Sequence, residues 1–161
     1  PIPLGEETGP NELLGHWLLN YKEGHPQGSV LDLTLPQQYV RIGANRRIAD
    51  RLIWAGLGRR PDIRQDVATI AVEFVSAGKR NWRRDYVDKR KEYMAAGIQE
   101  YWIIDRFQRT LTVIRPRPAQ PEEQVVGEKG TYQTPLLPGF ELPLERLLGA
   151  ADWLAAEGSG G

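Results

Sequence analysis

The run Thr69-Ile-Ala-Val-Glu-Phe-Val-Ser76 is almost continuously apolar and is flanked by polar segments on both sides. An apolar run of this length is typical of a central strand whose two faces are both covered. Alternation along the strand places Glu73 on one face together with Ala71 and Val75. Burying an unpaired carboxylate there costs roughly 2 to 5 kcal/mol, unless it gains a cation, a hydrogen-bonding partner or a proton. Glu73 is therefore a candidate functional residue; the alternatives are a structural ion pair with an arginine and a strand end that reaches water.

A helix is expected after this strand, over residues 81–96, with Gly97 as its C-cap. Side chains at helical spacing define its inward stripe, which consists of Trp82, Tyr86, Lys89, Tyr93 and Ala96. Lys89 interrupts this stripe with a charge. Because a helix that follows a strand packs back over the sheet, Lys89 can approach the carboxylate of Glu73. The alternative is that Lys89 lies at the edge of the stripe and pairs with Asp85, four residues earlier.

The rest of the chain predicts further strands and helices in a mixed order. Apolar spacing predicts a helix over about 11–23, with Asn11 as its N-cap, and a last helix over 144–156. Short β-prone runs predict strands at 30–35, 39–42, 52–55, 101–104 and 111–114, the first two being separated by Pro36. Loops are expected at 58–67 and 116–121. This order is that of an α/β protein built around one sheet.

Length and composition indicate a folded domain. The 161 residues suffice for about one domain, which we expect over 1–157, followed by a Gly/Ser tail at 158–161. No apolar run approaches the roughly 18 to 20 residues of a membrane helix, and nothing at the start suggests secretion. We therefore expect a cytoplasmic protein without membrane contact. Because the sequence begins at Pro1 rather than methionine, we also expect it to be trimmed.

The cysteine and histidine content excludes several classes of site. Without any cysteine there is no disulfide, no thiolate zinc site and no cysteine nucleophile. The two histidines, His16 and His25, share no helix face, so neither a histidine zinc triad nor a Ser/His/Asp hydrolase is expected. Any catalysis must therefore use carboxylates, lysines and hydroxyls.

Charge is segregated along the chain although the net charge is zero. Residues 41–91 contain fourteen basic and six acidic side chains, whereas the segments on either side are both acidic. Arginine suits phosphate oxygens, so this middle third is a candidate surface for a polyanion. Within it, Arg80, Arg83 and Arg84 are candidate nucleic-acid contacts. The alternative is an ordinary solvated helix face with its neighbouring loops.

Two acids and a lysine that converge are the parts of a metal-dependent phosphodiesterase. Mg²⁺ takes one or two carboxylates plus waters and phosphate oxygens, while a lysine can orient the attacking water or offset charge on the phosphate. A second acid beside Glu73 is therefore needed. Asp50, which opens a strand, is preferred over Asp62, which lies in a polar loop where Pro-Asp is also an ordinary turn signal.

Several strings in this region are specific, namely Ile70-Ala-Val-Glu-Phe-Val-Ser76, Arg84-Asp85, Lys89, Tyr93, Gly97, Glu100-Tyr-Trp-Ile-Ile-Asp105 and Leu136-Leu-Pro-Gly-Phe140. On these residues the chain resembles the Uma-two family of bacterial endonucleases, a branch of the PD-(D/E)xK superfamily, over about residues 11–148. The resemblance implies a restriction-endonuclease-like core, with a mixed central sheet flanked by helices. It also implies Mg²⁺ or Mn²⁺ as cofactor, DNA as partner, hydrolysis of DNA phosphodiester bonds and a homodimer as a candidate assembly.

The resemblance assigns roles to three central residues. Asp50 matches the first acid of the superfamily, Glu73 the second acid and Lys89 a lysine that has moved to the helix. The first two would hold the metal ion. The sequence departs from the superfamily pattern at Ala49, where proline is usual, and at Val75, where the standard lysine would stand.

Supporting roles follow from the same resemblance. Ser76 and Asp85 match positions near the site, where they would support the metal or its ligands, and Tyr93 is a further supporting candidate. The leading hypothesis is thus a metal-dependent DNA endonuclease, and the alternative is an inactive nucleic-acid-binding module of the same fold. A third hypothesis, an interaction protein that uses Trp153 on the last helix, depends on that apolar stretch alone.

Overall fold

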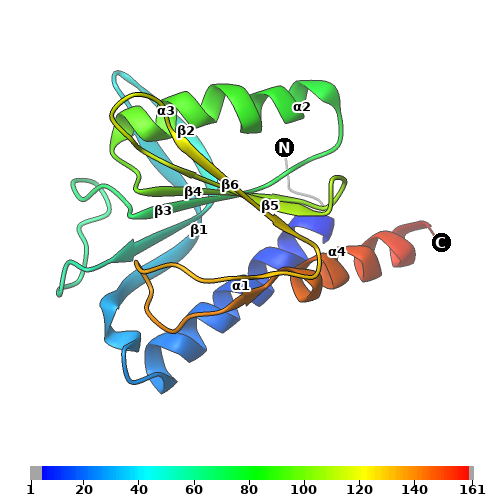
Figure 1. The fold of residues 1–161 in the computed structure, drawn as a ribbon, viewed down its shortest axis with the longest axis horizontal. Helices are drawn as coiled ribbons and strands as arrows, with labels where there is room; N and C mark the ends of the chain where they lie inside the picture. The colour runs from blue at the N-terminus through cyan, green and yellow to red at the C-terminus, as the bar shows by residue number, and fades with distance from the viewer. Residues whose placement is uncertain (1–4, 160–161) are drawn as a thin grey trace.

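A six-stranded mixed sheet forms the centre of the computed structural model, which describes residues 5–159 and the side chains of 5–156 (Figure 1). Its strands lie in chain order: β1 (Leu31–Ile42), β2 (Asn45–Ala55), β3 (Ile70–Phe74), β4 (Glu100–Asp105), β5 (Thr110–Arg115) and β6 (Glu122–Gly127). Every neighbouring pair is antiparallel except β3 and β4, which are parallel. This mixed sheet confirms the expected fold class.

Helices cover both faces of the sheet (Figure 1). On one face lie α1 (Gly5–Gly24) and α4 (Leu144–Ser159), together with the small pair β7 (Thr131–Tyr132) and β8 (Leu142–Pro143). On the other face one helical segment runs through α2 (Lys79–Arg83), the π-helical η2 (Arg84–Asp88) and α3 (Lys89–Ala96). This segment is the crossover that a parallel pair of strands requires. Between Gly5 and Ser159 no helix is long and apolar enough to cross a membrane.

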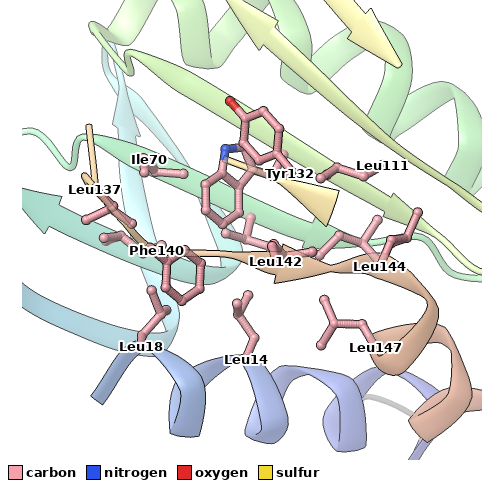
Figure 2. Close-up of a cluster of buried hydrophobic side chains, with 14 of the residues drawn as sticks. Leu14, Leu18, Ile70, Leu111, Tyr132, Leu137, Phe140, Leu142, Leu144 and Leu147 are labelled. Atoms are coloured by element: carbon pink, nitrogen blue, oxygen red, sulfur yellow. The ribbon is translucent and has the colours of Figure 1, made fainter. Parts of the chain in front are cut away.

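Two hydrophobic cores lie on opposite faces of β3. Its residues Ile70, Val72 and Phe74 belong to the core shared with α1 and α4, whereas Ala71 and, directly after the strand, Val75 belong to the core under α3. Figure 2 shows how the first core is filled from three directions. Leu14 comes from α1, Ile70 comes from the sheet, and Phe140 and Leu142 come from the segment that includes β8. The central strand expected for the 69–76 run is confirmed, because every residue of β3 is buried and its side chains alternate between the two cores.

The first two strands differ from the expectation. Pro36 does not separate two short strands, since β1 continues through it to Ile42. β1 is an edge strand, where a residue without an N–H group is tolerated. β2 likewise begins at Asn45 rather than at residue 52, so that Asp50 lies within this strand.

The first helix begins earlier than expected, at Gly5, and continues through Pro10. Asn11 is therefore not an N-cap. Its buried side chain instead donates a hydrogen bond to the carbonyl oxygen of Asp50 (2.8 Å) and accepts one from Nε of Arg51 (2.7 Å). These contacts attach α1 to β2 at the level of Asp50. At the other end of the chain α4 continues past residue 156 to Ser159, and residues 160–161 of the expected tail lie outside the described residues.

Glu100, at the start of β4, is buried in a fully occupied polar network. Its carboxylate accepts hydrogen bonds from Trp102, Tyr132 and Thr134 at 2.8 to 2.9 Å and from Nε of Arg115 at 3.0 Å. The network connects the sheet to the segment that contains β7. Such a network is stabilising only while every member has its partner.

Replacing Glu100 should therefore destabilise the fold. We expect Glu100→Ala to lower the free energy of unfolding by about 3 to 5 kcal/mol, because the guanidinium of Arg115 and three donors lose their acceptor. Glu122→Ala removes the exposed partner of Arg115 and should cost about 1 kcal/mol or less. Denaturant titration of both variants measures the difference, and equal losses would contradict this role of Glu100.

Candidate active site

Asp50 and Glu73 lie side by side on the adjacent strands β2 and β3. The register that pairs Arg51 with Val72 brings the two acids next to each other. The backbone N–H of Asp50 donates to Oε1 of Glu73 (3.1 Å), and the backbone N–H of Phe74 donates to Oδ2 of Asp50 (2.7 Å). Each carboxylate is thus held by the backbone of the other strand, which fixes both in place.

Lys89 reaches these acids from α3. Its ammonium forms a buried ion pair with Oε2 of Glu73 and also lies 3.7 Å from Oδ1 of Asp85 and 3.4 Å from the carbonyl oxygen of Ile48. The hydroxyl of Tyr93, one turn further along α3, donates to Oε1 of Glu73 (3.3 Å). The structure therefore brings Asp50, Glu73, Lys89 and Tyr93 together, and Lys89 contacts both of its expected partners.

The π-helical segment η2 changes which side chains face the sheet. A π-helix has more residues per turn than an α-helix, and such segments often occur at functional sites. Asp85 is fully buried here, whereas Trp82, expected on the inward stripe, is 44% exposed. As a result Asp85, Lys89 and Tyr93, spaced four residues apart, are the buried residues of this segment. The expected stripe was thus wrong at Trp82, because it assumed a regular helix.

Burial dominates the electrostatics of this cluster. Desolvation raises the pKa of Glu73, against the opposing effect of Lys89, and the nearby charges of Asp50 and Asp85 raise it further. Desolvation likewise raises the pKa of Asp85 to about 6 and is the main cause of a raised pKa at Asp50. The three carboxylates influence one another and Lys89, so they form one electrostatic unit.

Two neighbours of this unit were not expected. Glu7 on α1 is buried, its carboxylate accepts a hydrogen bond from the hydroxyl of Ser76, and its charge raises the pKa of Asp50. Gln37 on β1 has a φ of 51° and approaches Oδ1 of Asp50 with its amide nitrogen (3.4 Å). Glu7 was missed because Asn11 was interpreted as the N-cap, which left the first turns of the helix out of the prediction. For Gln37 no sequence signal exists.

Asp62, the alternative first acid, is not part of this cluster. It lies in the exposed loop between β2 and β3, where its carboxylate accepts the backbone N–H of Arg64 in a local turn (2.9 Å). Its own backbone N–H donates to Asp66 (2.8 Å). The geometry therefore favours Asp50.

The basic middle third is not one continuous surface. Arg51 is buried against α1, and Arg47, Arg59 and Arg90 pair with Glu92, Asp66 and Glu123 respectively. Arg80 and Arg83 are exposed on α2, and no ion pair among the described side chains involves them. Arg84 lies 3.5 Å from Oδ1 of Asp85. Arg80 and Arg83 are thus accessible to a phosphate. Arg84 instead contacts the acidic cluster, which consists of Asp50, Glu73 and Asp85.

The donor set suits a magnesium ion that is held partly by water. Within residues 5–156 no three His, Asp or Glu side chains form an arrangement that could hold a metal ion by themselves. Mg²⁺, however, is usually bound by one or two carboxylates plus waters and phosphate oxygens. Asp50 and Glu73 supply such a pair, and both carboxylate oxygens of Asp85 are buried without a hydrogen-bonding partner. A divalent cation would offset this local excess of buried carboxylate.

The raised pKa of Asp85 predicts that Asp85→Asn stabilises the metal-free protein above about pH 6. The folded-state pKa exceeds the ordinary value of 3.8, so the stability contributed by Asp85 is fully present below about pH 4 and is lost as the pH rises to about 6. The variant has no such loss. Melting in EDTA should show a difference that grows between these pH values to about 5 to 10 °C, because two pKa units correspond to about 3 kcal/mol.

Asp66→Asn provides a control of opposite sign. The hydrogen bond from Arg59 lowers the pKa of Asp66 to about 2, so its stabilising effect appears as the pH rises above that value. This variant should therefore lose stability relative to the unchanged protein between about pH 2 and 4, and the difference should stay constant above pH 4. A pH-independent difference for Asp85→Asn would contradict the assignment.

Known proteins share both the sequence pattern and the fold. Residues 1–145 match the model of the Uma2 family, described as "Putative restriction endonuclease". The chain is also similar in fold to a crystal structure from Anabaena variabilis, described as a "putative nuclease belonging to DUF820", with a TM-score of 0.67. The two chains are 13% identical, and the match covers 94% of this chain and 84% of that one. No curated protein matches the sequence. Since the family model spans most of its length, the chain belongs to the Uma2 family.

Proposed function

We propose that this protein is a metal-dependent endonuclease that hydrolyses phosphodiester bonds of DNA. The observation that carries the proposal is the position of Asp50 and Glu73 on adjacent strands, with the buried ammonium of Lys89 against Glu73. Membership of the Uma2 family supports the same reaction class. Carboxylates beside a lysine, in a protein without cysteine, are suited to phosphoryl chemistry.

Asp50 and Glu73 would hold Mg²⁺ or Mn²⁺, which supplies positive charge to the phosphate and lowers the pKa of bound water. Lys89 orients the attacking water or stabilises the charge that develops on the phosphate in the transition state. Tyr93 and the backbone N–H of Phe74 keep the two carboxylates in position. Asp85 balances the charge of Lys89 from the helix side.

The DNA backbone would be bound by the arginines of α2. Arg80 and Arg83 are exposed, and they lie a few residues before Asp85 and Lys89 on the same helical segment. A phosphodiester held there is kept close to the acidic cluster. Because such contacts neutralise phosphates, binding is expected to weaken as the salt concentration rises.

Cleavage of supercoiled plasmid tests the proposal. We expect nicking with Mg²⁺ or Mn²⁺ and none with EDTA, because the carboxylates need the cation to act on the phosphate. Asp50→Asn, Glu73→Gln and Lys89→Ala should each lower the initial rate by about 100-fold or more. Asp62→Asn should retain activity, because its carboxylate lies outside the cluster. The rates are measured from the conversion of supercoiled to open-circular DNA.

The control for Lys89 is Lys129→Ala, which removes an exposed lysine that pairs with Glu145. It should cleave at the unchanged rate. Cleavage that survives in Glu73→Gln would overturn the site. Salt-sensitive retention of DNA without any metal-dependent cleavage would instead indicate the alternative, an inactive nucleic-acid-binding module of the same fold.

Metal binding should be visible without any DNA. A ligand that binds only the folded state at about 100 times its Kd adds about 2.7 kcal/mol of stability. We therefore expect saturating Mn²⁺ or Mg²⁺ to raise Tm by several degrees at neutral pH. Asp50→Asn should lose this increase, whereas Asp62→Asn should keep it. Identical increases in both variants, measured by differential scanning fluorimetry, would contradict the role of Asp50.

A further inference from the structure

An exposed tryptophan lies in the most basic stretch of the helical segment. Trp82 is 44% exposed, and α2 with the residue after it contains Lys79, Arg80, Arg83 and Arg84 but no acid. No ion pair within the described side chains involves the first three of these cations. A large apolar ring among unpaired cations is not explained by packing of the core.

The ring of Trp82 is held in a fixed position. It stacks on Tyr86, with ring centroids 5.2 Å apart and planes inclined by 27°. The hydroxyl of Tyr86 donates to Oδ2 of Asp105 (2.8 Å), and Oδ1 of Asp105 accepts the backbone N–H groups of Phe107 and Gln108 (2.9 Å each). The support for Trp82 thus reaches into the β4–β5 turn. A rigid ring binds a partner without the entropic cost of ordering a mobile side chain.

A second pair of an arginine and an aromatic ring lies in the same turn. The guanidinium of Arg106 stands 4.5 Å from the ring centre of Phe107, which is also about half exposed. β3 and β4 are parallel and both end here, because the backbone N–H of Val75 bonds to the carbonyl of Ile104 (2.9 Å). Figure 1 shows the β4–β5 turn at the same end of the sheet as the start of α2. The aromatic side chains therefore lie at the end of the sheet where β3, the strand that carries Glu73, terminates.

Basic side chains interleaved with exposed aromatic rings are suited to single-stranded nucleic acid. In a regular duplex the faces of the bases are covered by their neighbours, whereas an unpaired base can stack on an aromatic side chain. Arginines beside the ring bind the phosphates of the same strand. A duplex uses the arginines but cannot use the ring unless a base is unpaired.

We propose that Trp82 is a stacking platform for an unpaired base, so that the preferred substrate is single-stranded DNA or DNA with unpaired bases near the cleavage point. The preference for cleavage depends on the proposed function, but the stacking does not, because binding is measurable without metal. Trp82 and the supporting Tyr86 thus determine substrate class, while Arg80 and Arg83 provide affinity for either form of DNA.

Fluorescence anisotropy in EDTA tests this proposal on the full chain. The probes are a labelled strand of about 16 nucleotides, its blunt duplex and the same duplex with unpaired bases at its centre, at about 0.1 M NaCl. Trp82→Ala should weaken binding of the single strand about tenfold or more and binding of the blunt duplex less than about twofold. Trp82→Phe, which keeps an aromatic ring, should be intermediate.

Trp153→Ala is the matched control, because it removes an exposed tryptophan on α4 (63% exposed) far from α2 in the chain. It should bind all probes like the unchanged protein, whereas Arg80→Ala should weaken binding of single strand and duplex alike. Thermal melting shows whether Trp82→Ala is folded, and Trp82→Phe provides the comparison if it is not. Equal losses on strand and duplex, or no loss on either, would overturn the proposal.

The two proposals fail separately. Strand binding that depends on Trp82, without metal-dependent cleavage, would support the stacking platform and refute the endonuclease. Cleavage that depends on Glu73, with no difference between single strand and duplex in Trp82→Ala, would refute the platform and leave the endonuclease standing.

Discussion

The buried ion pair between Glu73 and Lys89 is the interaction on which the rest of this molecule depends. A strand covered on both faces cannot carry an ionised side chain without a partner, and the partner must come from the layer above it. The helical segment that connects β3 to β4 therefore has to present its lysine at one defined height over the sheet. Tyr93 is buried beside the pair, and the π-helical turn adds Asp85 to the same face of the segment.

Much of the fold could be predicted because its central strand is distinctive. The 69–76 run, the helix after it and the expected α/β order all agree with the structure. The errors occurred where a local signal was overruled by position in the fold. Pro36 is tolerated on an edge strand, and Asn11, expected to begin the first helix, lies within α1. The short strands β6 to β8 were not expected, since β6 consists largely of exposed residues without an apolar pattern. The homodimer and the cytoplasmic location stay predictions.

The candidate site could be predicted where charge conflicted with its surroundings. Glu73 and Lys89 were found because each interrupts an apolar pattern, and Asp50 because a strand next to Glu73 gives it a fixed place. Glu7 and Gln37 do not conflict with anything in their own segments. Their positions follow from the packing of α1 and from the backbone of an edge strand, which a single sequence does not specify. The catalytic roles of all these residues stay proposals.

The packing of α1 against α4 has a consequence for the order in which the molecule assembles. These two helices lie at opposite ends of the described sequence, yet they contact each other under the sheet (Figure 1). Contacts between distant segments form late, both in refolding and during synthesis, because the intervening chain must be made first. The layer with Lys89 needs only residues 31–105 and can close early. The opposite layer, by contrast, lacks α4 until the last residues of the chain have been made, so the two faces of the sheet are completed at different stages of synthesis.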